Sequence, residues 1–356
     1  MSKAYSSRSG RMGRTERMGV ALLLLMMGVG VPGPEATEAG TLQRVKLTQP
    51  VSALTFLPID VARANKYFEE EGIGLEVIVT QGDGPNVQAL LAKDVDFSAS
   101  APHHLYRLYL EGKPLLGVVN MMNRSAINFV MHKDVAKQRG ITAETPLSAK
   151  LKALKGLTIG VTRPGALTYH LAVYFTKKAG YQPQKDVQIL AVGGGPAIIA
   201  ALENRKVDIF AFSPPVPEQA VVRGPGLMFI DNAAGEDADL GEFLMMVLYV
   251  RPEYAREHPG MVRGMARALV RANAWIAQQP PDAIAKAVRP FFPTVSPELL
   301  SASVRTVKKA IVPDGRLTAK SSDTFQDIML VSGALPRKVP FEAVLTNDYL
   351  PGGAAR

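Results

Sequence analysis

From residue 45 to residue 214 the chain alternates short apolar runs with stretches of mixed polarity that are long enough for helices. Short apolar runs bounded by glycine, proline or polar residues are typical of β-strands. The pattern predicts strands at residues 45–48, 75–80, 95–100, 117–122, 127–132, 157–162, 187–192 and 207–213. Helices are expected at residues 53–71, 86–93 with Asn86 as N-cap, 166–179 and 197–204, and one more opens at Pro102. Strands and helices that alternate in this way indicate an α/β fold.

The second half of this region repeats the first. Four features recur in the same order, separated by 111 to 113 residues. The corresponding pairs are Ala53-Leu54-Thr55-Phe56 with Ala166-Leu167-Thr168-Tyr169, Gly84-Pro85 with Gly195-Pro196, Val95-Asp96 with Val207-Asp208, and Pro102 with Pro214. A nearly constant offset through several elements predicts two similar α/β lobes.

After residue 250 the pattern becomes helical. Residues 253–279 carry an apolar stripe at helical spacing, which predicts one helix with a buried face. Ser296 is expected to cap a second helix, and Asp323–Ser332 to form a third that ends at Gly333. No candidate catalytic or binding residues are recognised in these helices, and their methionines are interpreted as core residues.

The first 39 residues have the three parts of a secretory signal peptide. A basic start is followed by an uncharged apolar run from Met18 to Val31, and then by small residues suited to cleavage near Ala39. The apolar run is shorter than the roughly 20 residues of a membrane span. We therefore expect the protein to be exported from the cytoplasm, with an uncleaved N-terminal anchor as the alternative.

Composition narrows the possible chemistry. The chain has 356 residues, no cysteine and five histidines, which excludes disulfides, thiol catalysis, lipid attachment through cysteine and cysteine-bound metals. The net charge is +9. The basic residues are scattered without interleaved aromatic residues, so we expect no nucleic-acid partner. We also expect no metal and no cofactor.

Polar, glycine-rich loops follow the predicted strands in both halves. In an open α/β sheet, ligands bind beyond the carboxyl ends of the strands, where backbone N–H groups and helix N-termini favour anions. The expected ligand loops are Gln49–Ser52, Gly82–Asn86 and Ser98–His103 in the first half, and Thr162–Thr168, Gly193–Pro196 and Ser213–Pro215 in the second. If the two lobes face each other, these loops form the two walls of one cleft.

Several polar residues near these loops have two interpretations. Asp96 and Asp208 are expected to bond nearby backbone rather than to act as acids. Of His103 and His104, we expect one to face the cleft and the other the solvent. The hydroxyls of Ser100 and Thr168 either meet a ligand or cap a helix. Arg124 and Arg163 either neutralise an acidic ligand or are ordinary surface residues.

No catalytic set is visible. The chain contains neither a GxSxG nor an HExxH motif, and no GxxxxGK[ST] phosphate loop accompanies the glycines at 193–195. The residues therefore predict an exported, two-lobed protein that binds a small molecule and is not an enzyme.

The ordered series of segments resembles the periplasmic solute receptors of ABC importers for nitrate, alkanesulfonates and taurine. The segments are TQPVSALTFLPIDVARANKYFEEEGI, GDGPNVQALLAKDVDFSASAP, LKGLTIGVTRPGALTYHLAVYFTKKAGY, ALENRKVDIFAFSPP and SGALPRKVPFEAVLTNDYL, and the likeness extends over about residues 43–350. The resemblance implies a type II periplasmic-binding-protein fold with two α/β lobes joined by two crossover strands near residues 127–132 and 243–250. The lobes would be residues 41–127 plus 246–356, and residues 128–245.

The same resemblance implies a ligand site, partners and a location. The implied ligand residues are Gln49, Ser52, Ala53, Ser100, Ala101, His103, Asn120, Arg124, Gly165, Ala166, Leu167, Thr168, Ser213 and Pro214. The expected protein is a periplasmic monomer that binds a small polar or anionic nutrient and delivers it to an inner-membrane permease. The first loop carries Val51 and Ser52 and no aromatic residue for stacking. Related folds also host a pyrimidine-synthase-like or lyase-like enzyme, or a ligand-sensing domain, and these remain alternatives.

Overall fold

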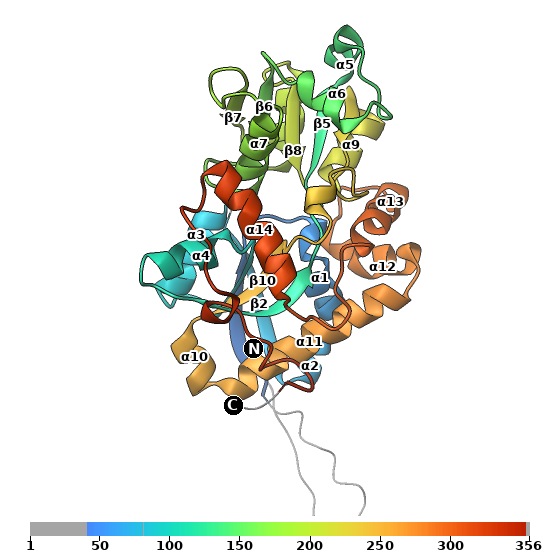
Figure 1. The fold of residues 1–356 in the computed structure, drawn as a ribbon. Coiled ribbons are helices and arrows are strands. Elements are labelled where there is room, and N and C mark those ends of the chain that lie inside the picture. Colours follow the sequence, from blue (N-terminus) through green and yellow to red (C-terminus); the bar gives the residue numbers. More distant parts are fainter. Residues whose placement is uncertain (1–40, 81, 354–356) are drawn as a thin grey trace, which may run out of the picture. The chain divides into compact units, whose positions relative to one another are not determined.

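The computed structural model describes residues 41–80 and 82–353. The predicted signal peptide lies outside these residues. Two five-stranded mixed sheets, each covered by helices, form the framework (Figure 1). Within the described residues, no helix combines the length and the apolar character that a membrane crossing requires.

The first sheet has the strand order β2-β1-β3-β10-β4. β1 runs parallel to β2 and β3, and β10 runs antiparallel to both of its neighbours. The bounds are β1 Gln43–Gln49, β2 Ile73–Val79, β3 Phe97–Ser100, β4 Leu116–Met122 and β10 Met246–Val250.

The second sheet has the order β7-β6-β8-β5-β9 and the same pattern of directions. Its strands are β5 Asn128–His132, β6 Thr158–Val161, β7 Gln188–Ala191, β8 Ile209–Phe212 and β9 Gly226–Ile230. In each sheet the antiparallel fourth strand, β10 or β5, arrives from the other sheet. The chain therefore crosses between the sheets twice, as the fold prediction requires.

The predicted repeat extends to individual hydrogen bonds. The backbone N–H of Lys46 donates to a carboxylate oxygen of Asp96 at 2.9 Å, and the N–H of Thr158 donates to Asp208 at 2.9 Å. Each aspartate directly precedes a strand, and its carboxylate accepts a hydrogen bond from the backbone of the neighbouring parallel strand. The structural interpretation of both aspartates is confirmed.

Helices cover the faces of the sheets. Those before residue 140 are α1 Leu57–Ala64, α2 Tyr67–Glu70, α3 Asp83–Leu91, α4 His103–Leu110 and α5 Lys133–Arg139. The next are α6 Leu147–Lys152, α7 Leu167–Lys178, α8 Gly195–Glu203 and α9 Val216–Arg223. The last are α10 Pro252–Glu257, α11 Pro259–Gln278, α12 Pro281–Val288, α13 Pro297–Lys308 and α14 Ala319–Ser332. Short 3-10 turns are η1 Leu54–Phe56, η2 Ala238–Leu240, η3 Arg289–Phe291 and η4 Phe341–Ala343.

Two predicted long helices are broken. The 53–71 helix becomes η1, α1 and α2, because Lys66 takes a left-handed conformation with φ 58° between the last two. The 253–279 helix is split at His258, whose φ of −127° departs from the helix before Pro259 opens α11. Proline disfavours helical backbone in the residue before it, which explains the second break.

Helix starts are corrected in three places. α3 begins at Asp83 and α8 at Gly195, each earlier than the sequence pattern predicts. Asn86 is therefore not an N-cap: its buried amide donates to Ser98 Oγ at 2.6 Å and to the Ala99 carbonyl at 3.1 Å. α14 begins at Ala319 because Thr318 accepts a hydrogen bond from the Ser321 N–H at 3.2 Å. The predicted cap at Ser296 is confirmed.

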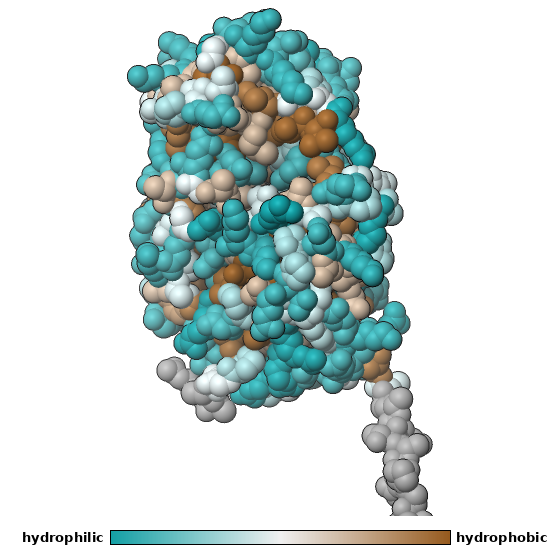
Figure 2. Space-filling model, turned by 90° about the vertical axis from the view of Figure 1, so that its right-hand side faces the viewer, coloured by the Kyte–Doolittle hydropathy of each residue, from teal (hydrophilic) through white to brown (hydrophobic). Residues whose placement is uncertain are grey.

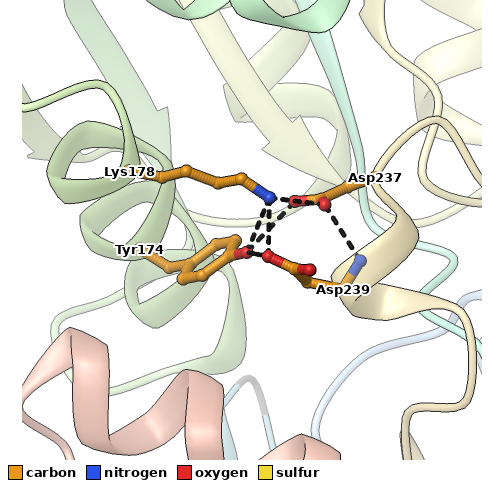
Figure 3. A network of polar contacts seen from close by, with 4 residues as sticks. All are labelled: Tyr174, Lys178, Asp237 and Asp239. Carbon is orange, nitrogen blue, oxygen red and sulfur yellow. Dashed lines mark hydrogen bonds and ion pairs between the residues drawn. The ribbon is translucent and has the colours of Figure 1, made fainter.

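A polar cluster fixes α7 to the turn around η2 (Figure 3). Lys178 Nζ donates to Asp237 Oδ1 at 2.6 Å and to Asp239 Oδ2 at 2.8 Å. The Tyr174 hydroxyl donates to the same two carboxylates at 3.2 and 3.0 Å. Asp237 is almost fully buried. The cluster therefore anchors a helix that starts at the candidate site described next.

Candidate ligand-binding site

A cavity of about 100 Å³ lies where the carboxyl ends of the parallel strands of both sheets meet. Its wall takes residues from the loop after each of the six strands β1, β2, β3, β6, β7 and β8, and from the two crossover segments. The lining residues are Pro50, Val51, Thr55, Phe56, Gly82, Asp83, Ala101, Ile127, Thr162, Arg163, Ala166, Leu167, Thr168, Gly193, Gly194, Phe212, Ser213 and Met246. This is the place where the topology of open α/β sheets favours ligand binding.

Three helices begin at the cavity. Their N-cap residues, Gly82 of α3, Ala166 of α7 and Gly194 of α8, all line the wall and provide no side-chain cap. The first N–H groups of a helix have no partner within it, and the helix dipole makes this end positive. The cavity is therefore suited to a negatively charged or strongly polar group.

One cation and one carboxylate lie in the wall. Arg163 is exposed and comes from the second sheet, yet its side chain packs on Gly82 of the first. A Cβ atom on Gly82 would lie 3.0 Å from Arg163 Cδ and 3.1 Å from Nε, so glycine permits this close approach. Asp83 is half-buried and accepts a hydrogen bond from Ser100 Oγ at 2.6 Å. The wall thus presents both signs of charge.

Two threonine hydroxyls are held in place on the second sheet's side. Thr162 Oγ1 and Thr168 Oγ1 lie 2.8 Å apart, and the Thr162 N–H donates to Thr168 Oγ1 at 3.2 Å. Thr168 is not an N-cap, because that position in α7 belongs to Ala166. Ser100 is not an N-cap either. Fixed hydroxyls of this kind can donate to or accept from a polar ligand.

The prediction for the paired histidines is wrong. His103 and His104 are both 4% exposed, so neither side chain faces the solvent. Their ring centroids lie 4.0 Å apart, and His103 lies 5.4 Å from the ring of His170 on α7. The helix that covers them comes from the other half of the chain, which a local pattern does not reveal.

Burial keeps these three imidazoles neutral. Desolvation lowers the pKa of His103 and lowers that of His104 to about 2, and the neighbouring imidazole acts in the same direction on each. Desolvation also lowers the pKa of His170 to about 4. None of the three supplies positive charge near pH 7. In residues 41–80 and 82–353, no group of three or more His, Cys, Asp or Glu side chains is arranged to hold a metal ion.

Five of the predicted ligand residues line the cavity: Ala101, Ala166, Leu167, Thr168 and Ser213. The others lie outside its lining: Gln49, Ser52, Ala53, Ser100, His103, Asn120, Arg124, Gly165 and Pro214. Several of these have structural bonds. The Asn120 amide donates to the Arg316 carbonyl at 3.0 Å, and Gln49 donates to the Val51 carbonyl at 3.2 Å. The Pro214 carbonyl accepts from the Leu54 N–H at 3.0 Å, which joins loops of the two sheets.

The two aromatic residues of the wall were not predicted. Phe56 and Phe212 bring two aromatic side chains to a cavity whose first loop has none. Phe56 belongs to η1, which the sequence pattern assigned to a continuous helix, and Phe212 ends β8. Of the two arginines with open roles, Arg163 lines the cavity and Arg124 does not.

Two curated proteins are similar along most of their length. The putative binding protein YtlA of Bacillus subtilis is 22% identical over 86% of this chain and 89% of its own. The riboflavin-binding protein RibY of Chloroflexus aurantiacus is 24% identical over 96% of this chain and 99% of its own. Both matches cover well over two thirds of each protein.

Solved structures share the fold. The nitrate-binding protein NrtA of Synechocystis has a TM-score of 0.67 at 14% identity, over 86% of this chain and 87% of its own. The alkanesulfonate-binding protein SsuA of Xanthomonas axonopodis has a TM-score of 0.66 at 16% identity, over 86% and 98%. The two-lobed fold of periplasmic binding proteins is thus confirmed. A sequence model described as the NMT1-like family matches residues 50–289, and the protein belongs to that family.

Proposed function

We propose that the protein is a periplasmic solute receptor, the substrate-binding component of an ABC importer. It binds a small polar or anionic nutrient in the cavity between the sheets and delivers it to a permease in the inner membrane. The observation that carries this proposal is the composition of the cavity wall, to which three loops from each sheet contribute. A ligand held there contacts both halves of the molecule at once.

The proposed mature protein begins after the signal peptide, residues 1–39, and acts as a monomer. Its lobes are residues 41–127 plus 246–356, and residues 128–245. The strands of the first range belong to one sheet and those of the second to the other, which supports this division. Two crossings of the chain connect the lobes and leave them free to rotate about a hinge.

The wall chemistry favours a ligand with an acidic group. Three helix N-termini and Arg163 surround the cavity with partial and full positive charge, and each helix end contributes roughly 0.3–1 kcal/mol toward an anion. Nitrate is itself an anion, and alkanesulfonates and taurine carry a sulfonate group. Asp83 repels a bare anion but attracts an ammonium, so taurine, which carries both a sulfonate and an ammonium, also fits the two wall charges.

Binding changes the balance between open and closed arrangements. The Leu54–Pro214 hydrogen bond and the contact of Arg163 with Gly82 hold the two walls together. A ligand that contacts both walls binds more tightly when they are close and thereby stabilises this state. The permease would recognise the closed, loaded receptor. No bond of the ligand is made or broken in this mechanism.

Calorimetric titration tests the proposal directly. Nitrate, taurine, methanesulfonate, riboflavin, a pyrimidine and benzoate are titrated into the purified protein. We expect saturable binding of one ligand per chain for at least one acidic compound, with the compound recovered unchanged. Turnover of the compound would favour the enzyme alternative, and no heat with any compound at high protein concentration would refute the receptor.

A further inference from the structure

A second, larger hollow adjoins the cavity. It has a volume of about 610 Å³ and lies between α8 and α9 on one side and residues 291–295 on the other. We call it the apolar groove. Its lining residues are Val51, Ser52, Gly194, Gly195, Pro196, Ile199, Ala200, Glu203, Phe212, Pro215, Val216, Gln219, Arg223, Gly224, Phe291, Phe292, Pro293, Thr294 and Val295.

The groove and the cavity share part of their walls. Val51, Gly194 and Phe212 line both. At Gly194, a Cβ atom would meet no heavy atom within 4 Å, so the space beside this residue is open. A molecule whose polar end occupies the cavity can therefore extend past Gly194 into the groove.

Most of the residues that line the groove are apolar. Ile199 and Val216 face it from the second sheet's helices, and Phe291, Phe292 and Pro293 face it from the opposite side. The Arg63 guanidinium lies 4.3 Å from the Phe291 ring centroid and fixes that ring. Glu203 and Arg223 add charge to the lining. The face that carries α9, α12 and α13 is largely hydrophilic, with hydrophobic residues gathered in its upper part (Figure 2).

We propose that the apolar groove is a second subsite, which holds the hydrocarbon tail of a ligand whose acidic head lies in the cavity. This inference rests on the proposed function, because it assigns a substrate class to the same site. The preferred ligand is then an amphipathic acid rather than a small inorganic anion. The 100 Å³ cavity contains the head, and the 610 Å³ groove contains the tail.

A series of sulfonates with a common head tests the subsite. Methanesulfonate, butanesulfonate, octanesulfonate and naphthalenesulfonate are titrated into the protein by calorimetry. Burial of each methylene in an apolar site strengthens binding about fourfold. We expect affinity to rise by that factor per methylene from the first to the second compound, and to level off once the tail fills the groove. Naphthalenesulfonate shows whether a flat tail is accepted.

Two variants of the groove distinguish the contribution of the ligand's tail to affinity from that of its head. Ile199→Ser makes the groove polar, and Ala200→Trp narrows it from an exposed helix position where folding is not at risk. Each variant should reduce the ratio of octanesulfonate to methanesulfonate affinity at least tenfold. Val331→Ser is the matched control, because Val331 is an exposed apolar residue on α14 outside the groove.

The outcomes distinguish this inference from the proposed function. If methanesulfonate binds and longer tails add nothing, the groove is no subsite and the receptor proposal stands. If tail length matters equally in the wild type and both groove variants, the tail lies elsewhere and the inference is overturned. If no sulfonate binds, the acidic head site fails and the inference fails with it.

Discussion

The buried histidines at the contact of α4 with α7 predict a specific loss of stability in acid. The contribution of His170 can be isolated by lowering the pH from 7.5 to 5.0. In the folded protein, desolvation lowers the pKa of this imidazole from 6.5 to about 4. Below pH 6.5 the unfolded chain therefore binds a proton that the folded chain does not.

The size of the effect follows from the linkage between protonation and folding. Above pH 6.5, His170 causes no loss in the free energy of unfolding. The loss grows as the pH falls from 6.5 toward 4. One pKa unit corresponds to 1.36 kcal/mol, so at pH 5.0 the loss is about 2 kcal/mol. His103 and His104, whose pKa values are also lowered, act in the same direction. Asp60 and Glu218 act in the opposite direction, because burial raises the pKa of each to about 7.

Urea unfolding followed by circular dichroism measures this contribution. The free energy of unfolding is determined at pH 7.5 and 5.0 for the wild type, for His170→Gln and for His258→Gln. His258 is exposed and serves as the matched control. We expect His170→Gln to lose about 2 kcal/mol less than the wild type on acidification, and His258→Gln to follow the wild type. Equal losses in all three proteins would show that burial of His170 does not cause the loss of stability in acid.

Three further predictions concern the wall and its support. Arg163→Met should weaken binding of an acidic ligand about 10- to 100-fold by calorimetry, whereas the control Arg139→Met, at an exposed site, should not. Equal affinities of Arg163→Met and the wild type would show that Arg163 does not contact the ligand. Lys178→Met leaves the buried Asp237 carboxylate without its ammonium and should lower the free energy of unfolding in urea by about 3 kcal/mol. A decrease of less than about 1 kcal/mol would show that the cluster does not stabilise the fold. Asn86→Ala unpairs buried groups on β3 and should cost about 1–3 kcal/mol, and an unchanged urea midpoint would contradict that.

The sequence predicts the architecture well because its signals are local and repeated. Alternating apolar runs locate strands, and the offset shared by Asp96 and Asp208 reflects the same backbone bond in both sheets. The predicted ligand loops also meet at one cavity, because parallel strands of a sheet end at the same edge. The pattern missed β9, α5, α6, α9 and α12, which are short or come directly after another element.

Individual side chains of the site are harder to predict, because their neighbours are distant in sequence. His103 is covered by His170, and Asn120 donates to the carbonyl of Arg316. Phe56 reaches the cavity because η1 and α1 replace a continuous helix. None of these contacts leaves a periodic trace in the sequence. The ligand roles of the predicted residues outside the lining therefore remain predictions.

Amide hydrogen exchange with and without bound ligand tests whether the ligand is held between the two sheets. The compound with the strongest calorimetric binding is added at saturation, and protection is compared along the chain. We expect slower exchange in loops of both sheets together, at Gly82–Asp83, Thr162–Thr168 and Gly193–Gly194. Protection confined to one sheet, or located on segments away from the cavity, would contradict binding between the two halves.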